Sequence, residues 1–294
     1  MPLEKQVIIK ILELLDANIL NGKSIRLQAN PFTMKTKYIL LISSTVLALF
    51  SFTKNKPQEK FTPPGTVKVG NFFFMDETEI SNFSWLEYVY WTERVYGKDS
   101  KQYADAQVDS NVWDEPYRSH YFSHPAYREY PVVGISYDQA VEYCQWRSDR
   151  VMEQLLIRKE QKNNVVIPSI LTYRLPTREE WEKVAQMPYS DKTQKSLNTK
   201  YKDAVKANFH STDPPVEEMT TTAPVFSYWP NELGIYNMRG NVSEMVTERG
   251  IVKGGGWTDL ENNIQIETGI PYTKPSKSIG FRCVCEVSFE NTES

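Results

Sequence analysis

Two capping boxes in the middle of the chain define where two helices begin. Residues 136–139 read Ser-Tyr-Asp-Gln and residues 177–180 read Thr-Arg-Glu-Glu, so the first and fourth side chains of each motif can satisfy each other's free backbone amides. The first motif predicts a helix over residues 137–158, and the second predicts a shorter one. After residue 188 short apolar runs alternate with turn residues and no long helical pattern follows. We interpret the chain as an α+β domain.

Further elements are predicted on both sides of these motifs. Residues 67–75 have the pattern of a strand, and residues 82–95 carry large apolar side chains at helical spacing. Residues 96–130 show no clear period, which predicts a long ordered loop or an irregular insertion. Residues 251–257 and 279–287 are predicted strands near the end of the chain.

The composition suits a domain whose loops are held by aromatic packing. The 294 residues include 17 Tyr, 7 Trp and 17 Pro but only 13 Gly, and 40% of them are hydrophobic, which is enough for a substantial core. With 34 basic and 37 acidic side chains, the net charge is -3. Such a balance provides no basic field for a phosphate backbone, so we expect no nucleic-acid partner.

The beginning of the chain has the layout of a targeting segment. Within residues 34–53 a basic start precedes an apolar run over residues 38–52, which is typical of a signal peptide or a signal anchor. We therefore expect an exported protein of the periplasm or cell envelope, with the apolar run as a membrane tether if it is not cleaved. Residues 1–33 are either an overextended start or a short amphipathic helix. No Cys near the end of the apolar run offers a lipid attachment point.

Five ordered segments give the rest of the chain a family resemblance. They are residues 75–82 (MDETEISN), 130–146 (YPVVGIS leading to AVEYCQW), 173–182 (YRLPTREEWE), 234–245 (GIYNMRGNVSEM), and 252–257 (VKGGGW) with 279–283 (IGFRC). Together they resemble the formylglycine-generating, or sulfatase-modifying factor, enzyme family. The resemblance implies a complex C-type-lectin-like fold with little regular secondary structure over residues 66–290. Residues 54–65, which are polar and rich in Pro, predict a linker into this domain.

A helical insertion near residues 148–172 lengthens the first capped helix beyond what the enzymes of the family need. With Trp-Arg-Ser-Asp-Arg-Val at residues 146–151, it resembles the family's branch among the gliding-motility and type IX secretion lipoproteins of Bacteroidetes. That resemblance implies a structural or binding component of the bacterial cell envelope, with envelope proteins as its partners.

The cysteine pair that holds copper in the enzymes of the family is missing. By the resemblance, its positions after the Gly-Gly-Gly-Trp segment fall on Asp259 and Ile264. Cu(I) selects soft thiolates, which a carboxylate and an aliphatic chain cannot replace. We therefore expect no catalytic residue and no copper here, and a non-catalytic protein. The alternative is a metal-dependent oxidoreductase of the formylglycine-generating type, which modifies a protein or small substrate through another metal arrangement.

The loop over residues 96–130 supports two further hypotheses. Its tyrosines suit a carbohydrate- or peptide-binding module: Tyr117, Tyr121, Tyr127 and Tyr130. His120, His124 and His210 invite comparison with the three-histidine iron centre of relatives of this family. Because His120 and His124 lie in a loop without a helical pattern, we interpret them as satisfied or solvated side chains.

A disulfide is implied by the resemblance. Cys144 and Cys283 match a pair that the family joins, and an exported domain meets an oxidising environment. The alternative is two buried free thiols. Cys285 stays unpaired in either case.

Structural calcium is also implied by the resemblance, because oxygen atoms of side chains and backbone surround this hard cation in the family. The first predicted site consists of Asn237, Gly240, Val242 and Glu244. The alternative is that Asn237 is an ordinary turn residue and Glu244 a carboxylate at a helix start. A second site would use Asn208, the carbonyl of Phe209 and Glu217.

Overall fold

The computed structural model describes residues 61–71, 73–162, 165–200, 207–210, 220–260 and 265–289. The predicted signal segment over residues 34–53, residues 1–33 and the first part of the linker lie outside the described residues. Within the described part, none of the helices combines the length and the apolar character needed to cross a bilayer.

The three predicted helices are present with the expected starts. They are α3 (Asn82–Tyr96), α6 (Tyr137–Gln161) and α7 (Arg178–Ala185). In both capping boxes the side chains and backbone amides bond each other as the sequence predicts. A further helix, α8 (Asp191–Thr199), was not predicted, because its nine residues are polar and bury only Leu197.

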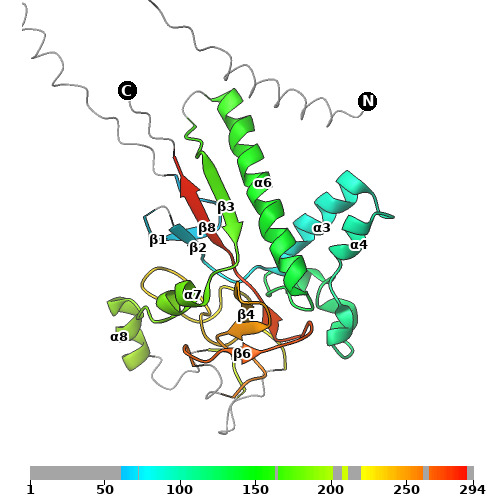
Figure 1. The fold of residues 1–294 in the computed structure, drawn as a ribbon. Coiled ribbons are helices and arrows are strands. Elements are labelled where there is room, and N and C mark those ends of the chain that lie inside the picture. Colours follow the sequence, from blue (N-terminus) through cyan, green and yellow to red (C-terminus); the bar gives the residue numbers. More distant parts are fainter. Residues whose placement is uncertain are drawn as a thin grey trace, which may run out of the picture. The chain divides into compact units, whose positions relative to one another are not determined.

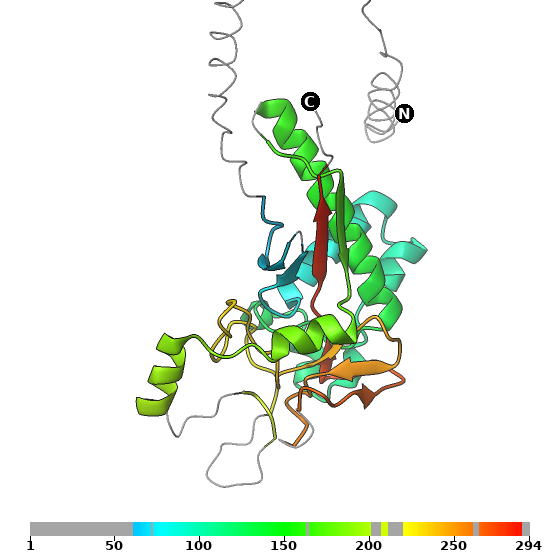
Figure 2. The same ribbon diagram turned by 60° about the vertical axis from the view of Figure 1, so that its left-hand side comes forward.

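Two small sheets complete the α+β domain (Figures 1 and 2). The first has the strand order β1-β2-β8-β3 and is antiparallel throughout, with the bounds β1 (Thr66–Gly70), β2 (Phe73–Asp76), β3 (Ile170–Arg174) and β8 (Val284–Ser288). The second has the order β6-β5-β4-β7, with the bounds β4 (Ser243–Met245), β5 (Ile251–Lys253), β6 (Ile270–Pro271) and β7 (Ile279–Gly280). In this second sheet β4 and β7 pair in parallel, and the other two pairs of neighbouring strands are antiparallel.

The predicted strands are longer than those of the structure. Residues 67–75 form a hairpin of β1 and β2 with an irregularity between Lys68 and Gly70, and residues 279–287 split between the two sheets. Between β7 and β8 the backbone leaves the ladder to bond the chain before α3, where Ile80 N–H donates to the carbonyl of Phe281. Strand β5 ends at Lys253 because Gly254 turns to a φ of 86°.

Residues 97–130 form a loop that is ordered by short helices. These are α4 (Lys101–Asp105), α5 (Tyr117–His120) and the 3-10 turns Ser110–Val112 and Pro125–Tyr127. The loop folds around Trp113, whose ring stacks on that of Trp257 with 6.0 Å between centroids. The prediction of a long ordered loop is thus confirmed.

The main core lies between α3, α6 and the first sheet. Trp85 of α3 stacks on Tyr143 of α6 with 5.4 Å between ring centroids, and Phe281 meets both rings edge-on. Figures 1 and 2 show α6 running alongside β3. There Ser148 Oγ accepts a hydrogen bond of 2.8 Å from the backbone N–H of Tyr173. The lengthened helix therefore covers the edge strand of the sheet.

Candidate functional site

The turn after the Gly-Gly-Gly-Trp segment places Asp259 in a structural role. Its Oδ2 accepts a hydrogen bond of 2.7 Å from the N–H of Gly256, and its own N–H donates to the Gly256 carbonyl. Its carbonyl also accepts from the N–H of His210. The carboxylate therefore closes the turn at the position where the family resemblance places a copper thiolate. Ile264, the second such position, lies outside the described residues.

The predicted cysteine pair is brought together in the core. Cys144 Sγ on α6 and Cys283 Sγ lie 3.5 Å apart, both side chains are buried, and both are free thiols. The disulfide between them stays a prediction. Cys285 is buried in β8 between β2 and β3, where burial raises the pKa of its thiol to about 12.

Glu244 of the first predicted calcium site belongs to a buried ion-pair network that sequence reasoning missed. Both oxygens of Glu244 accept hydrogen bonds from Arg282, at 2.6 and 2.7 Å, and Oε2 also accepts from Trp181 Nε1 at 2.7 Å. Arg282 and Glu244 are 0% and 1% exposed. Calcium would have to compete with this guanidinium for the carboxylate, and so the site at Asn237, Gly240, Val242 and Glu244 stays a prediction.

A second buried carboxylate lies next to this ion pair. Oε1 of Glu79 accepts a hydrogen bond of 2.8 Å from the side-chain amide of Asn241, and Oε2 accepts one of 3.1 Å from the side-chain amide of Asn237. Burial raises the pKa of Glu79 to about 7, while the charge of Arg282 opposes this shift and that of Glu244 adds to it. Two carboxylates therefore share the charge of one guanidinium.

The raised pKa of Glu79 predicts that stability falls as the pH rises. Its carboxyl titrates near 4.5 when unfolded and near 7 when folded, so the folded state binds the extra proton between these values. The contribution of Glu79 is complete below the lower value and is lost as the pH passes the upper one. We expect Glu79→Gln to remove this fall, measured as the free energy of unfolding in urea at about pH 5 and about pH 8. An identical pH dependence in both proteins would contradict the prediction, because all other titrating groups are common to them.

The second predicted calcium site is described only in part. Asn208 is buried, and its Nδ2 donates to the carbonyl of Thr221 and to Asn241 Oδ1. Its Oδ1 is buried, and no described residue donates a hydrogen bond to it, which suits a hard cation. Glu217 lies outside the described residues, so this site also stays a prediction.

The tyrosine and histidine side chains of residues 117–130 contact one another and nearby backbone. Tyr121 is buried, and its hydroxyl donates to the carbonyl of Pro131 at 2.7 Å. The rings of Tyr117, Tyr127 and Tyr130 pack around one another beside it. The exposed His120 and His124 each bond backbone within the loop, as the sequence interpretation expects. Among the described residues, no three His, Cys, Asp or Glu side chains gather as a metal site.

The chain is similar in sequence and in structure to several known proteins. Over 237 residues the chain is 24% identical to inactive C-alpha-formylglycine-generating enzyme 2 of Bos taurus, covering 70% of this chain and 68% of the relative. It is 24% identical to the formylglycine-generating enzyme of Bos taurus over 60% of this chain, and spans about half (48%) of that enzyme's length. The solved structure of CarF gives a TM-score of 0.47 at 21% identity, covering 76% of this chain and 96% of CarF.

The family is shown by a match over most of the chain. The model of the sulfatase-modifying factor enzyme 1-like domain matches residues 20–287, which include all five ordered segments and both sheets except the last residue of β8. The α+β fold with little regular secondary structure agrees with this match. The chain therefore belongs to the sulfatase-modifying factor, or formylglycine-generating enzyme, family.

Proposed function

We propose that this chain is a non-catalytic member of the family and acts as a structural or binding component of the bacterial cell envelope. The observation that carries the proposal is the engagement of Asp259 in its own turn, where the copper chemistry of the family needs a thiolate. The chain has only three cysteines, at positions 144, 283 and 285. All three are buried: Cys144 lies in α6, Cys285 in β8 and Cys283 just before β8. In these places they cannot serve as the cysteine pair of this turn. A relative whose name calls it inactive supports the same conclusion.

The envelope role rests on the apolar run at residues 38–52 and on the length of α6. The run would export or tether the chain, and the extra turns of α6 are those that resemble the gliding-motility and type IX secretion branch. Envelope proteins are the proposed partners. Antibody detection of the chain in isolated envelope membranes, and its absence from the cytosol, is the expected distribution; a purely cytosolic protein would contradict it.

A metal and oxygen assay tests the loss of catalysis. The full chain is incubated with Cu(I) and a cysteine-containing peptide, and bound copper, oxygen consumption and the mass of the peptide are measured. Because no thiolate pair is available at Asp259, we expect no stoichiometric copper and no peptide oxidation above the protein-free rate. An active formylglycine-generating enzyme serves as the positive control.

Stoichiometric copper binding with conversion of the peptide would overturn the proposal. An Asp259→Ala variant would then show whether the activity depends on this turn, because Asp259 stands at a copper position of the family and is a described residue.

A further inference from the structure

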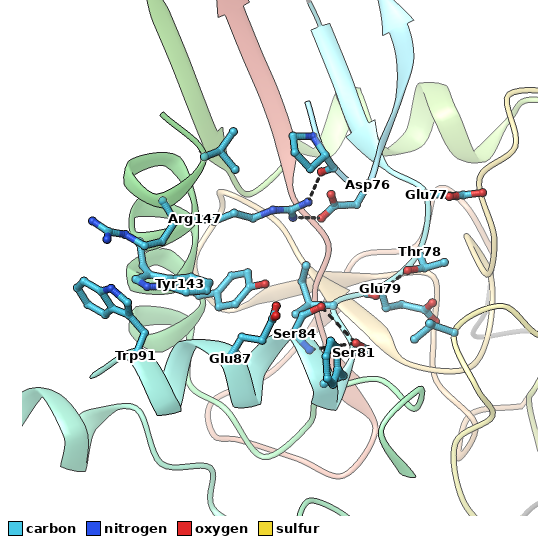
Figure 3. A pocket seen from close by; sticks show the side chains of 18 of the residues that line it. Asp76, Glu77, Thr78, Glu79, Ser81, Ser84, Glu87, Trp91, Tyr143 and Arg147 are labelled. Atoms are coloured by element: carbon cyan, nitrogen blue, oxygen red, sulfur yellow. Dashed lines mark hydrogen bonds and ion pairs between the residues drawn. The ribbon is translucent and has the colours of Figure 1, made fainter. Parts of the chain in front are cut away.

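A cavity of about 750 Å³ opens between α3, α6 and the chain that connects β2 to α3 (Figure 3). In this view Tyr143 of α6 and Glu87 of α3 project into the same space. Asp259 does not line the cavity. Its α6 wall includes Gln154, Leu155 and Arg158, which belong to the lengthened part of the helix. The helical insertion in this chain therefore supplies part of this wall.

Three buried polar atoms of the cavity's lining residues have no hydrogen-bond partner among the described residues. They are Oδ1 of Asp76, Nε1 of Trp146 and Nε of Arg150. Asp76 is 2% exposed, and only its Oδ2 is used, by Arg147 and by the N–H of Cys283. A ligand that reached these atoms after a small movement of their side chains would need a donor for Asp76 and acceptors for the two N–H groups. A peptide backbone offers both.

The charges around the cavity favour a cation. Glu77, Glu87 and Glu129 line it, and none of them forms an ion pair with the described residues. Two of the lining arginines are already engaged. Arg147 pairs with Asp76 at 2.8 Å, and Arg150 pairs with Glu153 and lies 4.6 Å from the ring centroid of Trp91. Among the arginines that line the cavity, Arg158 forms no ion pair with a carboxylate of the described residues. Carboxylates are thus in excess.

We propose that this cavity binds an extended peptide segment of a partner protein that carries a lysine or arginine side chain. The basic group faces the carboxylates of Glu77, Glu87 and Glu129, and apolar parts of the segment pack on Trp91 and Leu155. This proposal deepens the proposed binding role and rests on it. The cavity volume is within the range of pockets that bind a ligand the size of a short peptide segment. It is larger than a single cation needs.

The test begins with a selection of random dodecapeptides on phage against the full chain in detergent. The recovered sequences are expected to be enriched in Lys and Arg over the input library. A fluorescent synthetic copy of the strongest binder is then measured by anisotropy against four proteins: the original chain and the variants Glu87→Lys, Arg158→Glu and Asp149→Lys.

Opposite charge changes give opposite expected results. Glu87→Lys should weaken binding about tenfold and Arg158→Glu should strengthen it severalfold, because the first adds and the second removes repulsion of the basic group. Asp149→Lys is the matched control: it makes the same charge change on the exposed part of α6 outside the cavity, and should leave affinity within about twofold. If Glu87→Lys fails to fold, the Arg158→Glu variant decides.

Three outcomes would overturn the proposal. They are no enrichment of basic peptides, equal effects of Glu87→Lys and Asp149→Lys, and competition by a synthetic peptide of residues 54–62, which would identify a segment of this chain as the occupant. A positive copper and oxygen assay would overturn the proposed function alone, because that assay reports on the turn at Asp259 and this one on the cavity.

Discussion

Replacing Arg282 with methionine is expected to lower the free energy of unfolding by about 3–5 kcal/mol, because the change leaves the buried carboxylate of Glu244 without its counter-charge. The carbonyls of Asp76 and Tyr236 also lose donors, at 3.2 and 2.8 Å. Methionine keeps most of the side-chain volume, so the effect measures the ion pair more than a cavity. Urea unfolding gives the result as a lower midpoint at unchanged slope.

Two controls separate the buried pair from a general effect of charge. Arg249→Met removes an arginine whose ion pair with Asp138 is exposed to solvent, and should change the free energy of unfolding far less than Arg282→Met does. The double variant Arg282→Met with Glu244→Gln should recover part of the loss, since no buried charge remains unpaired. Equal stability of Arg282→Met and Arg249→Met would show that the network does not stabilise the fold.

Reduction of the protein is expected to lower its free energy of unfolding by about 4–5 kcal/mol through loss of the predicted Cys144–Cys283 bridge. The two residues are 139 positions apart, and so long a loop loses much conformational entropy in the unfolded state when it is closed. The figure is an upper one, because residual structure in the unfolded chain subtracts from it. Urea unfolding with and without a reducing agent measures the difference.

The thiol count provides a direct check of the bridge. Denatured but unreduced protein should expose one thiol, that of Cys285, out of the three in the chain. Cys285→Ser should keep the response to reduction, whereas Cys144→Ala should abolish it. Three titratable thiols in protein isolated from the envelope would contradict the disulfide and support two buried free thiols.

Local signals account for the elements that sequence reasoning placed correctly. The helices α6 and α7 begin at capping boxes, whose hydrogen bonds join residues three positions apart and are visible in the sequence. Strand lengths were wrong because they depend on partners: residues 279–287 have one apolar pattern, but the backbone at Phe281 bonds Ile80 and separates β7 from β8. Helix α8 has too few apolar residues to give a period.

Features of the site could be predicted where the chemistry depends on the type of residue at one position. Asp259 cannot be a thiolate, and the position of Cys144 and Cys283 in two segments of the family pattern predicted two thiols that the structure places 3.5 Å apart. The same Phe-Arg-Cys segment contains Arg282, but nothing in the sequence shows that its guanidinium pairs with Glu244, 38 residues earlier. That contact depends on β4 and β7 lying side by side.

The sequence by itself therefore determined the fold family, the capped helices and the absence of a thiolate pair after the glycine segment, because each of these is carried by residue identity or by bonds between near neighbours. Only the tertiary structure decided that Glu79 and Glu244 share the charge of Arg282, and that α3 and the lengthened α6 line a cavity whose carboxylates outnumber its bases among the described residues. Charge and hydrogen-bond balance in a buried site is a sum over neighbours from distant segments, so it exists only once the chain has folded.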